Sequence, residues 1–292
     1  MKLSILIVNW NTRDLVTRCI DSILHYPPDC DYEVIVVDNH SLDGSAEALF
    51  NLSSRSKQIR IIKSFQNFGF AKGNNLAYQN SSGEYVLLLN PDTQVREGAL
   101  EGMVEYLESH PEIGVLGPKL LNPDGTIQHS VRRFPGIFSA VAVFAGLHRL
   151  IPLRQYLMPD FNYEKTAGVD QVMGAAFLTR RKVIEELGSF LDENFWLWYE
   201  EVDFCRRIKA AGYKIVYYPG AEIRHEGAGS FAQMSIYERK KTAAKSLAHY
   251  FEKNGSRGEV MVLRIVIPVV MALAWIAEGF ERIFRVRHKI KY

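Results

Sequence analysis

Polar residues follow the apolar runs of this sequence at points where a simple turn would need only Gly or Ser. The run Tyr85–Leu89 leads directly into Asn90-Pro91-Asp92, so a proline fixes the backbone beside a carboxylate. Asn11 comes just after a first apolar run, and Asp38 follows a second. Carboxylates and amides can bind a base or ribose, and a lone Asp can hold a divalent ion that bridges two phosphates. These residue types favour a site for a nucleotide and a metal ion.

A third polar stretch, N-F-G-F-A-K-G-N-N, runs from Asn67 to Asn75 and opens a helix around Gly69. Backbone N–H groups at a helix start favour an anionic phosphate. The alternative is that these amides only satisfy the backbone of a turn. No GxGxxG follows the first apolar run and no GxxxxGK[ST] occurs. The sequence therefore gives no evidence for a dinucleotide-binding motif or a P-loop.

A cluster of acids follows the aromatic run F-W-L-W-Y, in which Trp196, Trp198 and Tyr199 are equally suited to stack on sugar rings or to join the core. The acids are Glu200, Glu201 and Asp203. Acids at a helix N-terminus are favoured by the helix dipole, which is a purely structural explanation. Three acids in four positions favour a catalytic role in addition. Like charges and apolar surroundings raise the pKa of a carboxyl group, which makes it a better general base.

Alternating strand and helix patterns must position these side chains. We expect strands at Leu3–Val8, Glu33–Val37, Ile59–Ile62, Tyr85–Leu89, Ile113–Gly117, Gln171–Leu178 and Lys214–Tyr218, with helices near 15–24, 45–52, 71–79, 99–109, 181–187 and 201–211. Continuous apolar strands separated by helices predict an α/β fold with a mostly parallel sheet, which binds ligands at the carboxyl ends of its strands. Residues 134–165 are expected to form a mobile or surface-lying connection, and the chain from Ser235 onward is expected to be helical.

Composition narrows the class of protein. The 292 residues are 47% apolar and 23% charged, which indicates a globular chain, and the net charge of +2 gives no reason to expect a nucleic-acid partner. Three separated cysteines without a CxxC pair fit a reducing compartment. The apolar stretch at the N-terminus is about six residues long and is interpreted as a buried strand rather than a signal peptide. A cytoplasmic protein is therefore expected.

Five motifs in order resemble those of the inverting family 2 glycosyltransferases, in particular their bacterial rhamnosyltransferase-like branch. They are V-N-W-N, V-V-D-N-H-S-L-D-G-S, N-F-G-F-A-K-G-N-N, L-L-L-N-P-D-T and W-Y-E-E-V-D-F-C-R-R, with His225 downstream. The resemblance covers about residues 1–230. It implies a GT-A domain at 1–230 followed by a helical extension at 231–292.

The resemblance also implies roles for the polar residues. Asp38 contacts the base or ribose of a nucleotide sugar, although an Asx turn or a helix cap is the alternative. Asp92 is the last acid of a DxD metal motif in which Asn90 replaces the first acid, and His225, taken as a loop residue, is the second ligand of Mg²⁺ or Mn²⁺; the alternatives are a helix-capping Asp and a surface His. The predicted donor-binding residues are Asn11, Asp38, Asn67, Gly69, Asn75 and Asn90.

The family places an E-D pair before this helix and uses the second acid as the base. Glu201 stands at that position here, with one more methylene, while Glu200 and Asp203 are its neighbours. Inversion at the anomeric carbon needs a base on the face opposite the leaving diphosphate, to take the proton of the acceptor hydroxyl.

The apolar stretch Val260–Ala277 is about 27 Å long as a helix, close to the thickness of a bilayer core. Its polar positions (Arg257, Arg264, Glu278, Arg282, Arg285 and Lys289) form one narrow stripe on a helix. This pattern favours a helix lying in the interface of an anionic membrane. The alternatives are a helix packed on the protein or on another subunit, and a transmembrane span.

Together these observations predict a metal-dependent enzyme at the inner face of the cell membrane. It would move a sugar, with rhamnose implied by the branch, from a nucleotide diphosphate donor to a lipid-linked or polysaccharide acceptor in cell-surface glycan synthesis. A homo-oligomer is compatible with the sequence. The alternatives are a nucleotidyltransferase and a non-catalytic subunit that binds nucleotide sugars.

Overall fold

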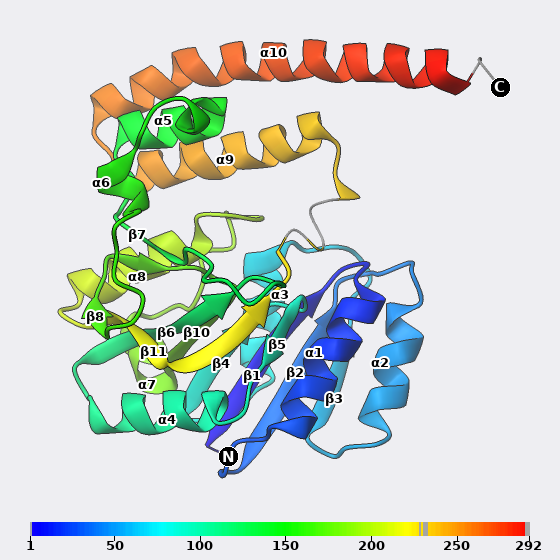
Figure 1. Cartoon of the computed structure of the whole chain (residues 1–292), viewed down its shortest axis with the longest axis vertical. Helices are drawn as coiled ribbons and strands as arrows, with labels where there is room; N and C mark the ends of the chain where they lie inside the picture. Colours follow the sequence, from blue (N-terminus) through cyan, green and yellow to red (C-terminus); the bar gives the residue numbers. More distant parts are fainter. Residues whose placement is uncertain (1, 228, 230–232, 290–292) are drawn as a thin grey trace.

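A nine-stranded mixed sheet forms the centre of the molecule (Figure 1). The computed structural model describes residues 2–227, 229 and 233–289, with side chains described up to residue 279. The strand order is β3-β2-β1-β4-β10-β6-β11-β5, and β8 pairs with β11; β7 and β9 form a separate two-stranded sheet. The first four strands are parallel, whereas β10 runs antiparallel to both of its neighbours. The fold is therefore α/β with a mixed rather than purely parallel sheet.

The strands β1 to β4 lie within one residue of their predicted ranges, whereas β6 runs four residues past its predicted end at Gly117, and the short strands β5, β7 and β8 were not predicted. The bounds are β1 Leu3–Asn9, β2 Tyr32–Asp38, β3 Ile59–Lys63, β4 Tyr85–Leu89, β5 Thr93–Val95, β6 Ile113–Leu121, β7 Val131–Arg132, β8 Ala167–Gly168, β9 Gln171–Val172, β10 Ala176–Arg180 and β11 Lys214–His225. Every residue of β1, β4 and β6 is buried. Helices cover both sheet faces, which explains why these strands show no polar alternation.

Helices connect the strands and extend the C-terminal part of the chain. Their bounds are α1 Arg13–His25, α2 Ser45–Ser53, α3 Phe70–Gln79, α4 Ala99–Ser109, α5 Ile137–Ala145, α6 Arg154–Leu157, α7 Arg181–Glu186, α8 Glu200–Ala210, α9 Ile236–Asn254 and α10 Arg257–Lys289, with a 3-10 turn η1 at Leu147–Arg149. Ser235 and Glu238 form a capping box at the start of α9. Ser256 and Glu259 exchange the same pair of hydrogen bonds at the start of α10.

Three sequence predictions require correction. The expected strand Gln171–Leu178 is two strands, β9 and β10, because the chain changes sheets at Gly174 between them. The expected strand Lys214–Tyr218 continues through a register shift as far as His225, which is therefore a strand residue rather than a loop residue. The segment 134–165 contains α5 and α6, and α5 packs against the C-terminal helices.

The C-terminal helices share a hydrophobic core with parts of the N-terminal region. Phe144 of α5, Phe195, Val202 of α8, Leu247 of α9 and Leu263 of α10 belong to one buried cluster. In Figure 1, α10 lies across the top of the molecule, with α9 and α5 between it and the sheet. The extension is thus packed on the residues that carry the predicted acid cluster.

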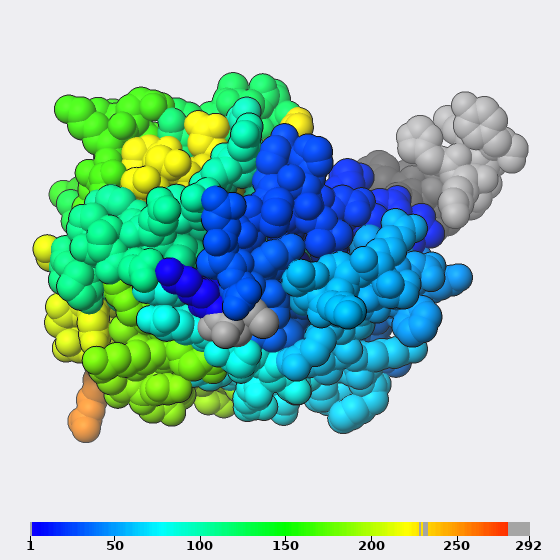
Figure 2. Space-filling view, turned by 90° about the horizontal axis from the view of Figure 1, so that it is seen from below, coloured from blue at the N-terminus to red at the C-terminus, as the bar shows by residue number. Residues whose placement is uncertain are grey.

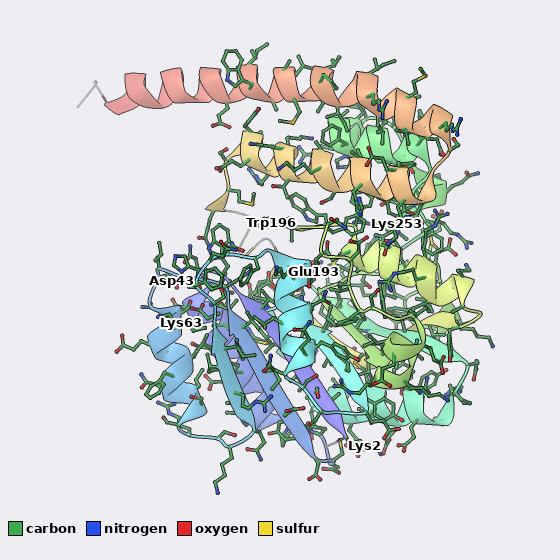
Figure 3. All side chains as sticks on the ribbon, turned by 180° about the vertical axis from the view of Figure 1, so that it is seen from behind. Lys2, Asp43, Lys63, Glu193, Trp196 and Lys253 are labelled. Atoms are coloured by element: carbon green, nitrogen blue, oxygen red, sulfur yellow. The ribbon has the colours of Figure 1, made fainter. Side chains whose placement is uncertain are left out.

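The two ends of the sheet differ in the residues they present. Figure 3 shows Lys2 at the end away from α10, and Asp43, Glu193 and Trp196 at the opposite end, which faces α9. Figure 2 looks onto the end away from α10, where the blue and cyan N-terminal elements lie beside the green middle of the chain. The carboxyl ends of β1, β2 and β4 lie at the end that faces the C-terminal helices.

Candidate active site

The carboxyl ends of β1 and β2 bring Asn9 and Asp38 together. The two residues are register partners, and Asn9 Nδ2 donates to Asp38 Oδ1 at 3.1 Å. Asp38 is fully buried, and its Oδ2 has no hydrogen-bond partner among the described residues. A buried carboxylate oxygen without a partner is costly, so this atom needs a polar group from a ligand or from water.

Asn11 and Ser41 tie the loops after these two strands to each other. Asn11 adopts a left-handed backbone conformation (φ 51°), and its N–H donates to Ser41 Oγ at 2.9 Å. Its side-chain oxygen accepts from Leu42 N–H at 2.7 Å. In this structure the predicted donor-binding residue Asn11 therefore shapes the loop that holds Asp38.

Asn39, next to Asp38, organises the loop that carries Asn67 and Gly69. Asn39 Nδ2 donates to Asn67 Oδ1 (2.9 Å) and to Gly69 O (3.0 Å), while its Oδ1 accepts from Phe68 N–H at 2.9 Å. Asn39 was not among the predicted site residues, although its place directly after a strand was a usable signal.

Gly69 and Asn75 both fasten α3 to the segment before α8. A Cβ at Gly69 would lie 2.4 Å from Trp196 O, and φ is +82°, so only glycine fits there. Asn75 exchanges hydrogen bonds with the backbone of Leu191, at 2.8 Å through Nδ2 and 3.0 Å through Oδ1. Both polar groups of the Asn75 side chain thus bond the backbone of the chain, which was the alternative to phosphate binding in the sequence.

Asp92 and His225 meet because β5 pairs with β11. His225 is the register partner of Thr93, and Glu226 N–H donates to Asp92 O at 2.9 Å. His225 Nε2 lies 3.3 Å from Asp92 Oδ1, and both side chains are buried. Burial alone would raise the pKa of Asp92, but the contacts with His225 and Gly229 N–H hold that pKa below its ordinary value. Two residues 133 positions apart are thus adjacent at the edge of the sheet.

Gln128 determines which nitrogen of His225 carries a proton. The amide Nε2 of Gln128 donates to Asn122 Oδ1 (3.1 Å) and His225 O (3.4 Å), so its Oε1 is the atom facing His225 Nδ1 at 2.7 Å. Because Oε1 can only accept, Nδ1 is the donor. A protonated ring would also donate from Nε2 to Asp92, whereas in the neutral ring Nε2 presents a lone pair toward that carboxylate, an arrangement that a bound cation would stabilise. Gln128 was missed in the sequence, where only the turn N-P-D-G-T before it was a signal.

These residues fit a divalent cation that is shared with a substrate. Within the described part of the chain there is no group of three or more His, Cys, Asp or Glu side chains placed to hold a metal ion. A site with one carboxylate and one imidazole would leave the other coordination positions to phosphate oxygens and water, as is common for Mg²⁺ and Mn²⁺.

Asn90 holds the turn between β4 and β5 through its backbone. Its N–H donates to Ala175 O at 2.8 Å, and its carbonyl accepts from Thr93 Oγ1 at 2.7 Å. The side-chain Oδ1 is buried and has no partner among the described atoms. The amide thus remains available to a ligand beside Asp92.

The acid pair begins α8 after two residues with strained backbones. Trp198 (φ 68°) and Tyr199 (φ 72°) both lie in the left-handed region, which is uncommon for non-glycine residues and clusters at functional sites. Glu200 is buried, and one carboxylate oxygen each of Glu200 and Glu201 lacks a partner within the described structure. The tight turn directs Glu201 into a cavity of about 430 Å³.

The two acids differ in their surroundings. Burial, followed by the nearby charge of Glu201, raises the pKa of Glu200 well above its ordinary value. Burial also raises the pKa of Glu201, while backbone hydrogen bonds and the guanidinium of Arg132 pull it partly back. Arg132 lines the same cavity as Glu201. When the pair holds one proton, these directions favour Glu200 as the protonated member and Glu201 as the ionised one.

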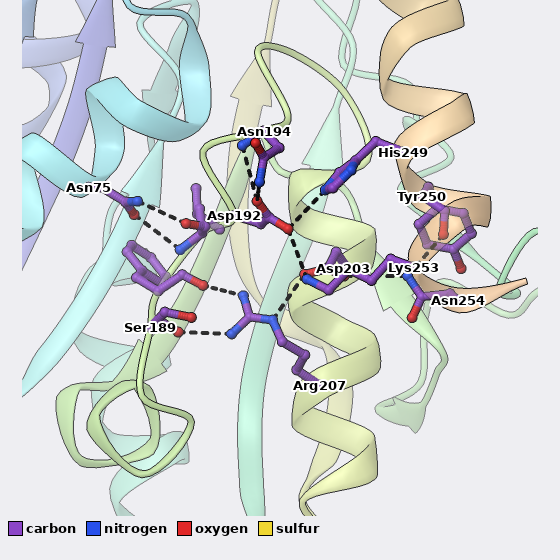
Figure 4. A network of polar contacts seen from close by, with 12 residues as sticks. Asn75, Ser189, Asp192, Asn194, Asp203, Arg207, His249, Tyr250, Lys253 and Asn254 are labelled. Atoms are coloured by element: carbon purple, nitrogen blue, oxygen red, sulfur yellow. Dashed lines mark hydrogen bonds and ion pairs between the residues drawn. The ribbon is translucent and has the colours of Figure 1, made fainter.

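Asp203 belongs to a separate network that fixes α9 to α8 (Figure 4). Its fully buried carboxylate accepts from Arg207 Nε at 3.0 Å and Lys253 Nζ at 2.9 Å. Asp192 joins the network through His249 and Lys253, each at 3.0 Å. Asp203 does not line the cavity of Glu201, and its contacts are those of a structural ion-pair network.

A short segment before β10 connects the Asp92 turn to Glu201. Ala175 O accepts from Asn90 N–H, and a Cβ at the adjacent Gly174 would lie 3.4 Å from the Glu201 side chain. The residues predicted for the metal and for the base therefore lie on either side of residues 174–175.

Sequence comparison decides the family. The family model described as "Glycosyl transferase family 2" matches residues 4–188, more than half of the chain. The chain belongs to glycosyl transferase family 2. The resemblance noted in the sequence is thereby confirmed, and this family 2 protein is an enzyme, which replaces the nucleotidyltransferase and non-catalytic alternatives.

Curated relatives of this glycosyltransferase include N-acetylglucosaminyl-diphospho-decaprenol L-rhamnosyltransferase of Mycobacterium tuberculosis. The two are 26% identical over 215 residues, which cover 68% of this chain and 67% of the relative. Protein y4gI of Sinorhizobium fredii is 26% identical over 238 residues, covering 81% of this chain but only 26% of that protein. The chain thus spans about a quarter of one relative and two thirds of the other.

A solved structure confirms the fold of this glycosyltransferase. The mannosyltransferase PcManGT of Pyrobaculum calidifontis, in complex with GDP-Man and Mn²⁺, superimposes with a TM-score of 0.60 at 15% identity. The match covers 94% of this chain and 73% of that structure. The predicted GT-A architecture is confirmed. At 15% identity the match shows the fold and not the residues of a site.

Proposed function

We propose that this family 2 enzyme transfers a sugar, with inversion, from a nucleotide diphosphate donor to a hydroxyl of a lipid-linked glycan at a membrane surface. The observation that carries the proposal is the convergence of Asp92 and His225 at 3.3 Å beside the segment that contacts Glu201. The name of the mycobacterial relative supports a diphospho-lipid acceptor and rhamnose as the sugar.

Asp92 and His225 would hold a Mg²⁺ or Mn²⁺ ion, and Gln128 would orient His225. The ion supplies positive charge that stabilises a departing diphosphate. Mn²⁺ accepts a nitrogen ligand more readily than Mg²⁺ does. Mn²⁺ is present in the solved relative PcManGT, which agrees with this choice.

On the nucleotide side, Asp38 Oδ2 is the group with an unfilled hydrogen-bonding position, so we assign it to the base or ribose. Asn90 Oδ1 also has no partner among the described atoms. It belongs to the turn that carries Asp92, and it could accept a hydrogen bond from a hydroxyl of the nucleotide sugar or from an ordered water. Asn11, Asn67 and Gly69 would mainly shape the two loops around the nucleotide sugar. The side-chain oxygens of Asn11 and Asn67 accept hydrogen bonds within the chain, and the Gly69 N–H donates to Asn67.

Glu201 would take the proton from the acceptor hydroxyl as that oxygen bonds to the anomeric carbon. Glu200, held neutral by burial, would not compete for this proton but would keep a second negative charge away from the site. A positioned base of this kind contributes about 10²–10⁴-fold to rate.

The outer face of α10 supports attachment to a membrane. By length and composition alone, residues 257–279 could cross a bilayer, and only 11% of the most apolar window is buried. The inner face packs on α9 and α5 through Leu263, Ile267 and Met271, whereas Ile265, Leu273 and other large apolar residues are exposed. If α10 crossed the bilayer, its inner face would have to leave this core, so we favour a helix that lies in the membrane interface. Of the predicted basic stripe, Arg257 and Arg264 are exposed, Glu278 bonds Tyr237 N–H, and the side chains of Arg282, Arg285 and Lys289 lie outside the described part.

The test is a screen of nucleotide sugars for donor hydrolysis and for transfer to a lipid-diphosphate-linked saccharide with Mg²⁺ or Mn²⁺. Asp92→Asn should abolish transfer and weaken Mn²⁺ binding, measured by electron paramagnetic resonance with a nucleoside diphosphate present. Thermal melting checks that the variant is folded. Full activity and unchanged Mn²⁺ binding in folded Asp92→Asn would refute the assignment.

A further inference from the structure

The cavity that contains Glu201 is bounded by the C-terminal helices as well as by the family 2 domain. Its walls come from α8 and the two-stranded sheet on one side and from α5 and α9 on the other. Its volume of about 430 Å³ lies in the range of small-ligand sites, about 300–1,000 Å³. Because a base in this cavity can reach only what enters it, the cavity defines which molecules present a hydroxyl to Glu201.

The walls of this cavity are largely apolar, and they carry Glu201 and three cations, Arg132 from β7 and two more from α9. Phe144, Val202 and Leu247 provide apolar surface, and α9 contributes Arg239 and Lys240. Neither cation has a carboxylate within ion-pairing distance among the described residues. Lys240 Nζ donates to the carbonyl of Phe144 and lies over the Phe144 ring, 5.1 Å from its centroid, so its contacts are with neutral groups. A partly buried ammonium that has no counter-anion is costly unless a ligand supplies one.

Burial lowers the pKa of Lys240, which is the expected sign for a cation without an anionic partner. The other basic residues nearby on α9, Lys241 and Lys245, are exposed to solvent and do not line the cavity. The helix α9 thus carries two cations that face the cavity beside apolar groups, two on the outer surface, and Lys253, which pairs with Asp192 and Asp203.

A second cavity next to the first is lined in part by α5 and by Glu259 of α10. It measures about 840 Å³, shares Tyr156 with the first cavity and is lined by Phe138 and Leu153. Phe138 is 65% exposed, and α5, which carries it, packs against α10. A chain placed in this cavity would pass Phe138 and Leu153 as well as the charged residues Arg133, Arg154 and Glu259, which line the same cavity.

We propose that Arg239 and Lys240 bind the phosphate groups of a polyprenyl-diphosphate-linked saccharide, which places its sugar at Glu201 and directs its prenyl chain past Tyr156 toward α10. This inference rests on the proposed function and adds the recognition element: the acceptor is selected by its diphosphate, not by its sugar alone. Phosphate could come from the diphosphate of the acceptor or from the headgroups of bulk anionic lipids. Arg239 and Lys240 are assigned to the diphosphate of the acceptor.

The first experiment measures binding without reaction. Farnesyl diphosphate is titrated into the full chain in neutral detergent and binding is measured by calorimetry. EDTA is present so that no metal ion at Asp92 and His225 can bind the diphosphate. Arg239→Ala/Lys240→Ala should weaken binding by roughly 10- to 100-fold, because hydrogen bonds to charged groups are lost. The control Lys241→Ala/Lys245→Ala removes the same charge from the same helix and should change affinity less than about 2-fold.

The second experiment measures transfer and donor hydrolysis. The Arg239→Ala/Lys240→Ala variant should raise the KM for the lipid-diphosphate acceptor while donor hydrolysis stays at the wild-type level. Equal affinity of wild type and variant for farnesyl diphosphate would overturn the inference, as would a loss seen only on vesicles with anionic lipid and not in neutral detergent. If the wild type binds farnesyl diphosphate but hydrolyses no nucleotide sugar, the proposed function fails while the phosphate site stands.

Discussion

The protonation of the Glu200–Glu201 pair gives a prediction that can be worked out from the geometry. Glu201 acts as a base only when ionised, so kcat/KM should be lost as pH falls through its raised pKa. The positive charge of Arg132 opposes that rise. Arg132→Met should therefore raise the pKa of Glu201 further and shift the acidic limb of the profile to higher pH.

The size of this shift follows from the cavity that the two residues share. Arg132 and Glu201 both line this cavity of about 430 Å³, and a sphere of that volume is roughly 9 Å across, which sets the scale of their separation. At an effective dielectric constant of about 20, opposite charges at that distance interact by about 2 kcal/mol before screening by salt. The acidic limb should thus move upward, by an amount that this interaction limits.

The assay is the pH dependence of kcat/KM for transfer, with melting temperatures recorded for each variant. Arg133→Met is the matched control, because Arg133 is the next residue, is exposed and pairs with Asp170 rather than facing Glu201. Glu201→Gln should lower kcat by about 10²–10⁴-fold. Glu200→Gln replaces a group already neutral and should keep most of the activity. An active Glu201→Gln enzyme, or an Arg132→Met profile that moves to lower pH, would refute the reasoning.

The other predictions concern the metal ligand, the attachment of α9 and the membrane face. Gln128→Leu should weaken Mn²⁺ binding by about 10–100-fold, measured by electron paramagnetic resonance, because the imidazole loses its orienting acceptor; unchanged affinity would argue against a ligand role for His225. Lys253→Met should reduce the free energy of unfolding by about 1–3 kcal/mol in denaturant titrations, since the buried Asp203 carboxylate loses one of two cations; a stability equal to wild type would contradict this. Ile265→Glu/Leu273→Glu should reduce co-flotation with anionic vesicles while leaving donor hydrolysis intact, and unaltered flotation would count against the interface model.

Local sequence patterns were enough to predict much of the fold and part of the site. Apolar runs predicted the strands β1 to β4 to within one residue. For β1, β2 and β4 the reason is that a strand buried on both faces must be continuously apolar, whereas the edge strand β3 has exposed residues. Motif order gave the family, which the family model confirms. Asp92 and His225 were named as partners, and their separation of 3.3 Å agrees with that pairing, although occupation by a metal remains a prediction.

Long-range pairing decided what the sequence left open. The strand β11 runs on to His225 because it pairs with β5, and nothing local to residues 214–225 encodes that partner. The different surroundings of Glu201 and Asp203, two positions apart, depend on how α8 packs against the rest of the chain, so only packing separates a cavity acid from a structural ion pair.

The sequence by itself determined the element types, the family and the chemical groups available, because these depend on residue identity and short-range periodicity. The tertiary structure decided which of those groups share a site. Gln128 behind His225, Arg132 beside Glu201, and the cations of α9 over the same cavity all come from segments distant in the chain. Their contacts arise from the pairing of strands and the burial of helices, which no local pattern specifies.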